Sequence, residues 1–147
     1  MARYCVYRER STWETEKKLD EYGLIPEAKD RIMAFLMTEG FVDDMRFAKI
    51  YARSKFVYHK WGRRKITIGL KKHRIIDTYV RQAMAEIDDE SYKETIRELI
   101  RKKCEEKKRL PMAVRKQKVS SYLYSKGYVW DEFEKILKDE CSENSPL

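Results

Sequence analysis

The chain has 147 residues, which is enough for one ordinary domain or for a few small helical units that share a core, and too few for two large independent domains. Hydrophobic residues make up 42% and aromatic residues 12%, as in folded proteins, whereas the charged fraction of 39% is well above the usual quarter and requires much surface. The 5 Gly and 3 Pro are too few for a hairpin-rich β architecture and favour long helices.

The spacing of apolar residues is helical along almost the whole chain. Tyr79, Val80, Ala83, Met84 and Ile87, for example, fall on one face of a helix. The pattern predicts eight or nine helices, with approximate bounds 2–10, 12–22, 26–39, 43–57, 63–73, 77–87, 89–108, 113–126 and 130–139.

Capping residues agree with these bounds. Ser11 and Glu14 have the spacing of a capping box, in which the serine hydroxyl accepts a backbone N–H and the glutamate reaches back to the cap. Gly23, Gly40 and Gly127 stand where a residue with left-handed backbone would end a helix.

A period of about fifty residues runs through the chain. Leu19, Leu70 and Leu123 each end a basic helix, with offsets of 51 and 53 residues between them. The period predicts an all-α fold, an elongated, curved array of three tandem three-helix repeats, because small repeats gain stability by packing on their neighbours. We expect the repeats to span residues 1–40, 41–87 and 88–141, followed by a disordered tail over 142–147. The alternative is a compact helical bundle whose helix ends are similar by chance.

The net charge of +8 is unevenly distributed. Residues 45–76 hold eleven Lys or Arg and no Asp or Glu, and residues 101–126 hold ten basic residues against Glu105 and Glu106. Opposite charges on helical surfaces often pair with each other, but an acid-free stretch must find its counter-charge elsewhere. This distribution favours contact with nucleic acid or with an acidic partner.

The cysteines and the start of the chain bear on location. Cys5, Cys104 and Cys141 are far apart and form no CxxC pair, so we expect free thiols in a reducing, cytoplasmic compartment. We also expect no export signal and no membrane span, because the apolar runs are only a few residues long.

We find no pattern typical of a catalytic or metal site in the sequence. His59 and His73 have no cysteine or carboxylate cluster nearby, and there is no Gly-rich phosphate loop or nucleophile elbow. The pair Asp43 and Asp44 is interpreted as a helix start rather than as a carboxylate pair for chemistry. We therefore expect no enzyme activity, no metal and no cofactor.

Basic residues are the best candidates for binding. The first set, chosen for contact with phosphates or with an acidic surface, is Arg53, Lys55, Arg63, Arg64, Lys65, Lys71 and Lys72. Repeat equivalence adds Lys116, Lys118 and Lys126. The alternative is a basic face that only meets solvent. Phe56, Tyr58, His59 and Trp61 interleave with the first set, as would suit stacking on unpaired bases, although packing between helices is the favoured interpretation.

A series of short motifs runs through the three repeats. It begins with residues 8–11, Glu14 and 17–19, continues with 40–48, Tyr51, 62–66, Leu70 and Ile75, and ends with 118–119, Leu123, 126–128 and Ile136. In these residues the chain resembles the RecX family, bacterial regulators of the RecA recombinase. No single motif is specific, but their order and spacing across three repeats are. Two departures are His73-Arg74, where a Lys-Gly pair is common, and extra residues around 107–112.

The resemblance implies tandem three-helix repeats that lie in the groove of a recombinase filament on single-stranded DNA, limit filament growth, and suppress ATP hydrolysis and strand exchange without a catalytic site. The expected partners are the RecA-type filament and its single-stranded DNA, bound by a monomer. A stand-alone helical nucleic-acid-binding protein, with residues 63–73 entering a groove, is the main alternative. A nuclease or other enzyme is a third.

Overall fold

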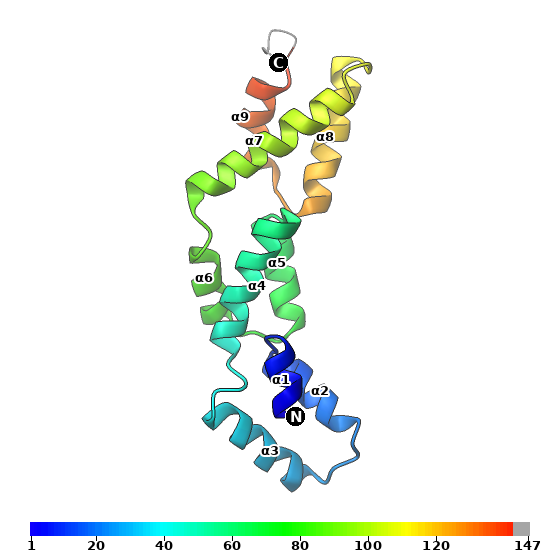
Figure 1. Ribbon diagram of the computed structural model, residues 1–147. Coiled ribbons are helices and arrows are strands. Elements are labelled where there is room, and N and C mark those ends of the chain that lie inside the picture. The colour runs from blue at the N-terminus through cyan, green and yellow to red at the C-terminus, as the bar shows by residue number, and fades with distance from the viewer. Residues whose placement is uncertain (143–147) are drawn as a thin grey trace. The chain divides into compact units, whose positions relative to one another are not determined.

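The computed structural model describes residues 1–142, and the elements that it contains there are all helices (Figure 1). The helices are α1 (Ala2–Tyr7), α2 (Thr12–Asp20), α3 (Pro26–Thr38), α4 (Asp44–His59), α5 (Arg63–Lys72), α6 (Asp77–Ala85), α7 (Asp89–Glu106), α8 (Met112–Lys126) and α9 (Trp130–Glu140). The all-α prediction is confirmed. Beyond Ser142, the expected tail lies outside the described residues.

The predicted helix bounds agree with the structure within two residues, with one exception. The first helix ends at Tyr7 instead of residue 10, because Arg8 has an extended backbone with φ −155°. The Arg10 side chain folds back, and its Nε donates to the Tyr4 carbonyl at 2.9 Å. That carbonyl lies in the last turn of α1, so a side chain partners it where a longer helix would have supplied a backbone N–H.

The three-helix repeats are visible at equivalent turns. Leu19, Leu70 and Leu123 are buried, with at most 1% of each exposed. Four residues after these leucines the backbone is left-handed, with φ +65° at Gly23, +57° at Arg74 and +98° at Gly127. Arg74 therefore keeps the turn that glycine makes in the other repeats, although a side chain makes that conformation less favourable.

The described chain divides into two compact units. The first comprises residues 1–54 and 67–86, and the second comprises residues 55–66 together with the chain from Ile87 onward. Helices α4 and α5 contribute residues to both units. In the first unit, α2 packs on α3, and a core cluster gathers Cys5, Leu19, Met33, Leu36 and Val42.

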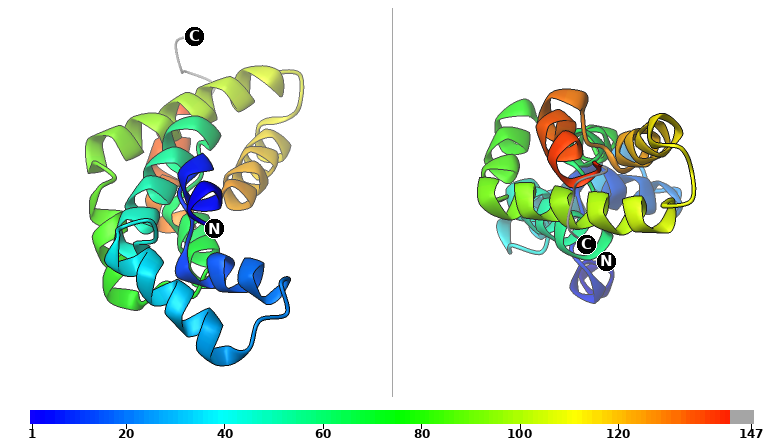
Figure 2. Two further views of the ribbon diagram at one scale, coloured as in Figure 1. Left: turned by 60° about the horizontal axis from the view of Figure 1, so that its bottom comes forward. Right: turned by 90° about the horizontal axis from the view of Figure 1, so that it is seen from above.

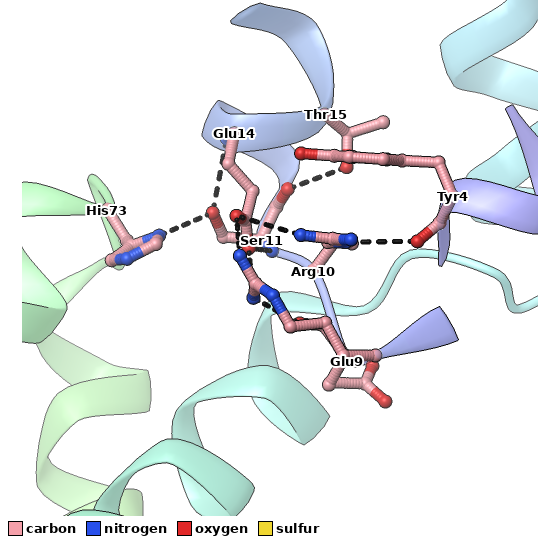
Figure 3. Close-up of polar contacts among 8 residues, drawn as sticks. Tyr4, Glu9, Arg10, Ser11, Glu14, Thr15 and His73 are labelled. Atoms are coloured by element: carbon pink, nitrogen blue, oxygen red, sulfur yellow. Dashed lines mark hydrogen bonds and ion pairs between the residues drawn. The ribbon is translucent and has the colours of Figure 1, made fainter. Parts of the chain in front are cut away.

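A buried polar cluster in the first unit links α2 to the turn after α5 (Figure 3). Ser11 caps α2 by accepting from the Glu14 backbone N–H at 3.2 Å, which confirms the capping box. Its hydroxyl also lies 2.7 Å from His73 Nδ1. Thr15 donates to the Ser11 carbonyl at 2.9 Å, and the Arg10 guanidinium lies over the Tyr4 ring. Ser11 and Thr15 are fully buried, so these bonds satisfy groups that water does not reach.

The core of the second unit is built from α7, α8 and α9. Both α8 and α9 pack against α7, and the two pack on each other (Figure 2). Fully buried side chains include Ile96, Ile100, Leu123, Tyr128 and Phe133. Leu123 among them is the repeated leucine of the predicted third repeat.

The expectation of three free thiols is wrong. Cys104, near the end of α7, and Cys141, just after α9, form a disulfide, with Cα atoms 6.0 Å apart. Cys5 alone is a free thiol among the described cysteines, and it is buried. Spacing along the sequence did not indicate this pair, because folding brings together residues that are 37 positions apart.

Within residues 1–142, no helix combines the length and the apolar character that a membrane crossing needs.

Candidate nucleic-acid interface

Two acid-free basic segments are hydrogen-bonded to each other in the second unit. Residues 55–66 come from the second repeat and residues 107–126 from the third, and neither contains Asp or Glu. The Gly62 N–H donates to the Lys126 carbonyl at 2.7 Å. The hydroxyl of buried Tyr128 donates to the Lys60 carbonyl at 2.8 Å. We call this contact the junction, defined by residues 60–62 and 126–128.

Close backbone packing explains the two glycines of the junction. A Cβ on Gly62 would collide with the Gly127 backbone carbonyl, and a Cβ on Gly127 would collide with Lys65. Gly127 also needs its left-handed backbone to end α8. The junction therefore fixes the spacing of the basic side chains on either side of it.

Lysine ammonium groups lie against an indole beside the junction. The Trp61 ring has Lys65 Nζ 4.5 Å and Lys55 Nζ 4.9 Å from its centroid. Lys65 Nζ also donates to the Ser125 carbonyl at 3.3 Å, which links α5 to the end of α8. Such distances are within the range of cation–π attraction.

A second aromatic ring, that of Tyr122 on α8, also has two lysine ammonium groups beside it. The Tyr122 ring has Lys103 Nζ at 4.3 Å and Lys126 Nζ at 5.8 Å from its centroid. Lys126 Nζ donates to the His59 carbonyl at 3.1 Å, on the other side of the junction. We call the set Lys55, Trp61, Lys65, Lys126, Tyr122 and Lys103 the aromatic–lysine row.

Seven of the ten predicted binding residues fall in the second unit. They are Lys55, Arg63, Arg64, Lys65, Lys116, Lys118 and Lys126. Three of these, Lys55, Lys65 and Lys126, belong to the aromatic–lysine row. Arg64 is exposed on α5, and Lys118 is exposed on α8 next to partly exposed Lys116. The second unit thus collects basic side chains from both acid-free segments.

Arg63 is held by the fold more than the others. One of its guanidinium nitrogens is 2.8 Å from Asp89 and 3.0 Å from the Ile87 carbonyl, and the guanidinium lies over the Tyr92 ring. The side chain is 29% exposed. These contacts attach the start of α5 to the start of α7 and leave fewer donors for a phosphate.

The other three predicted residues belong to the first unit. Arg53 is 62% exposed and makes a long ion pair of 3.5 Å with Glu86. Lys71 and Lys72 are exposed in the last turn of α5, where cations meet the negative end of the helix dipole.

Burial changes the pKa values of two tyrosines next to the interface. It raises the pKa of Tyr92 and Tyr128 far above the usual value for tyrosine. Both phenols therefore stay protonated at neutral pH. Tyr128 keeps its hydrogen for the Lys60 carbonyl, and the Tyr92 oxygen accepts from the Arg63 backbone N–H at 2.9 Å.

Comparison with known proteins places this architecture in a family. The models of the second and third three-helix domains of RecX match residues 43–84 and 90–137. The chain is 34% identical over 142 residues to the regulatory protein RecX of Clostridium acetobutylicum. This chain belongs to the RecX family. The two matched ranges lie inside the predicted second and third repeats.

The relatives differ in length. The alignment with the Clostridium acetobutylicum RecX covers 91% of this chain and 65% of that protein. The RecX of Lactobacillus johnsonii is 26% identical, with 85% of this chain and 46% of that protein covered. The chain thus spans about half to two thirds of the length of these RecX proteins.

Solved structures show the same fold. The crystal structure of RecX from Lactobacillus salivarius matches with a TM-score of 0.85 at 22% identity, covering 94% of this chain and 90% of that one. A second crystal structure of a regulatory protein RecX matches with a TM-score of 0.82 at 26% identity, covering 93% of this chain and 67% of that one.

Acidic residues cap helix starts, as the sequence predicted for Asp43. Asp43 Oδ1 accepts from the Arg46 backbone N–H at 3.0 Å, and Asp88 caps α7 by accepting from the Ser91 backbone N–H at 2.9 Å. That backbone bond lowers the pKa of Asp88. Asp44 caps a different helix, α2, through the Thr12 backbone N–H at 2.7 Å. Over the part of the chain that the structure describes, no group of His, Cys, Asp and Glu could hold a metal ion.

Sequence reasoning missed two members of the aromatic–lysine row. Tyr122 lies one helical turn before Lys126, so the spacing of these two on α8 was available as a signal. Lys103 comes from α7, and only the packing of α7 on α8 brings it to the ring. Trp61 was weighed for stacking, with packing between helices favoured. It is partly exposed, with two lysines and the His59 ring against it. Phe56 does pack in the core, against Tyr92.

Proposed function

We propose that this RecX-family chain regulates a RecA-type recombinase by binding the filament that the recombinase forms on single-stranded DNA. The observation that carries the proposal is the junction, which joins two acid-free basic segments into one unit. A nucleoprotein polymer presents repeated phosphates and acidic side chains, and a basic surface of this kind is complementary to them. The names of the relatives, which are regulatory proteins, support a role in regulation.

We propose the predicted residues as the contact residues and rank them by their position relative to the aromatic–lysine row. Lys55, Arg64, Lys65 and Lys126 are the foremost candidates, because they stand in or beside the aromatic–lysine row. Lys116 and Lys118 extend the basic surface along α8. Arg53, Lys71 and Lys72 are proposed as a separate contribution from the first unit. Arg63, at the start of α5, is proposed to contribute only in part, because Asp89 of α7 holds its guanidinium.

The proposed mechanism is a shift of an equilibrium. A protein that binds a filament alters assembly or turnover only by the difference in its affinity for two filament states. No bond in a substrate has to break in such a mechanism, so we propose that the chain is not an enzyme. We also propose that it acts as a monomer. We propose a cytoplasmic location, where the chromosome and its recombinase are found, and repeats bounded at 1–40, 41–87 and 88–141.

Binding to three targets tests this function. We expect the chain to bind the assembled filament more tightly than it binds either the recombinase alone or bare DNA, as measured by fluorescence anisotropy with labelled chain. Sequence-specific binding to bare double-stranded DNA, with no gain from the filament, would favour the stand-alone nucleic-acid-binding protein and refute the regulator.

Salt dependence gives an independent check. Each lysine or arginine contact with a single-strand phosphate contributes about −0.7 to the slope of log affinity against log salt concentration. We expect a slope that corresponds to several such contacts. A flat response would show that the basic surface does not meet phosphates.

A further inference from the structure

We infer that Trp61 and Tyr122 are stacking platforms for unpaired bases, and that the lysines around them hold the phosphates of the same strand. The ligand class is single-stranded nucleic acid. The inference rests on the proposed function, since it names the component of the filament that this surface contacts directly and the groups that do so.

The composition of the aromatic–lysine row is the first argument. Each ring lies against two ammonium groups, Lys55 and Lys65 at Trp61, and Lys103 and Lys126 at Tyr122. Binders of single strands combine a positive track for the backbone with aromatic faces for the bases. The row provides both within one unit and alternates them over short distances.

The contrast with neighbouring aromatic residues is the second argument. Phe56, Tyr92 and Tyr128 are buried, and their rings pack on one another with centroids 5.7 and 5.3 Å apart. They form the core. Trp61 and Tyr122 are partly exposed and have cations at their faces. Trp61 and Tyr122 therefore belong to a positively charged surface and not to the core.

Rigidity is the third argument. Trp61 directly precedes Gly62, whose N–H is bonded to the Lys126 carbonyl at 2.7 Å, and Tyr122 lies one turn before Lys126 on α8. Lys65 and Lys126 each donate to a backbone carbonyl across the junction. The two platforms are therefore positioned before a ligand arrives, which reduces the entropy lost on binding.

The chemistry predicts a preference for single strands. A base in a duplex has both faces covered by its neighbours, whereas an unpaired base can leave its stack and place one face on a ring. As it arrives it replaces an ammonium group at that face, and the flexible lysine turns to the adjacent phosphate. Every base has such a face, so the surface should tolerate any sequence.

The competing occupant is an acidic protein surface, such as one on a recombinase subunit. The lysines would serve it equally well through charge, but the ring faces would then add little. Rings and bases must therefore be removed separately to distinguish the two occupants.

The experiment is a cycle in which a ring and the bases are deleted in turn. Labelled oligothymidylate of about 16 nucleotides, the upper end of typical site sizes, is compared by fluorescence anisotropy with an abasic strand of equal length. The variants are Trp61→Ala, Tyr122→Ala and the conservative Trp61→Phe. Trp130→Ala is the matched control, because Trp130 is 43% exposed in the same unit and lies outside the row. Circular dichroism checks the fold of each variant.

We expect Trp61→Ala and Tyr122→Ala each to weaken binding of oligothymidylate about 5- to 10-fold, the lower part of the range for one stacked base. Binding of the abasic strand should change by less than about twofold, since no stacking is lost there. Trp61→Phe should restore most of the affinity, and Trp130→Ala should have no effect on either strand. Equal losses on both strands would overturn the inference, because the rings would then act only through the lysines or the fold.

The failure of this inference differs from the failure of the proposed function. If the wild-type chain binds the filament but does not bind the bare oligothymidylate, the stacking platforms are refuted and the proposed regulation of the recombinase is not. A chain that shows the coupling between ring and base but gains nothing from the filament would support the platforms and refute the regulator.

Discussion

Replacing Gly62 with alanine tests the junction on which the basic surface depends. The added Cβ would collide with the Gly127 carbonyl and would lie 2.7 Å from the Tyr128 backbone nitrogen. Both neighbours are backbone atoms, so no change of rotamer relieves the contact. The two segments must move apart instead.

The magnitude follows from the bonds that separation would break. The Gly62 N–H bond to Lys126 and the Tyr128 hydroxyl bond to Lys60 contribute about 1 kcal/mol each. Gly62 is not among the left-handed glycines, so alanine at this position would otherwise stabilise the chain by about 0.4–1 kcal/mol through the unfolded state. The free energy of unfolding should therefore fall by about 1–2 kcal/mol, and by more if the core also shifts.

Urea denaturation followed by circular dichroism measures this loss. Gly69→Ala is the contrast, since its Cβ would meet the hydroxyl end of the Tyr51 side chain and helical alanine is favoured over glycine by about 1 kcal/mol. Its net cost should be smaller. If Gly62→Ala is as stable as the wild type, the junction is not packed as described and the shared basic surface has no structural basis.

Three further predictions concern stability. Reducing the Cys104–Cys141 disulfide should lower the free energy of unfolding by about 3–4 kcal/mol, as expected for a loop of 37 residues, and the Cys104→Ser, Cys141→Ser double variant should not respond to reductant in urea melts. Arg74→Gly should stabilise the chain by about 1 kcal/mol in the same assay, because the left-handed turn at φ +57° then carries no side chain; a loss of stability would contradict the strain argument. Burial, opposed chiefly by the charge of a neighbouring glutamate, lowers the pKa of His73. The unfolded chain therefore binds the proton more readily than the folded chain does. The contribution of neutral His73 to the free energy of unfolding is complete above pH about 6.5 and is lost as the pH falls through the lowered pKa. His73→Gln should flatten the thermal stability profile between about pH 7 and 5 relative to the matched His59→Gln variant, and an unchanged profile would refute the assignment.

Local signals were sufficient for the helices and their repetition. Apolar spacing and the capping box at Ser11 predicted where helices begin and end, because both depend on residues within a turn of one another. The equivalence of Leu19, Leu70 and Leu123 predicted three similar turns, and the left-handed backbone at Arg74 shows that the turn persists without glycine. The acid-free segments indicated which part of the surface is basic.

Contacts between distant segments were beyond such reasoning. Cys104 lies on α7 and Cys141 directly follows α9, and only the packing of α7 against α9 brings them together. Arg63 looked like a free phosphate ligand until folding placed Asp89 2.8 Å away. Lys103 reaches Tyr122 for the same reason, through packing of α7 and α8. Composition predicts the sign of a surface, whereas the partner of each side chain depends on the tertiary fold.

Co-sedimentation of a charge-reversed chain with the assembled recombinase filament tests the central claim most directly. The variant carries Arg64→Glu, Lys65→Glu and Lys126→Glu, and its control reverses the same number of exposed lysines elsewhere in the second unit, Lys93, Lys102 and Lys138. We predict that the first variant, folded by circular dichroism, loses filament affinity by more than tenfold and that the control loses far less. Equal retention of both chains on the filament would contradict the proposal that the basic surface at the junction is where this protein binds.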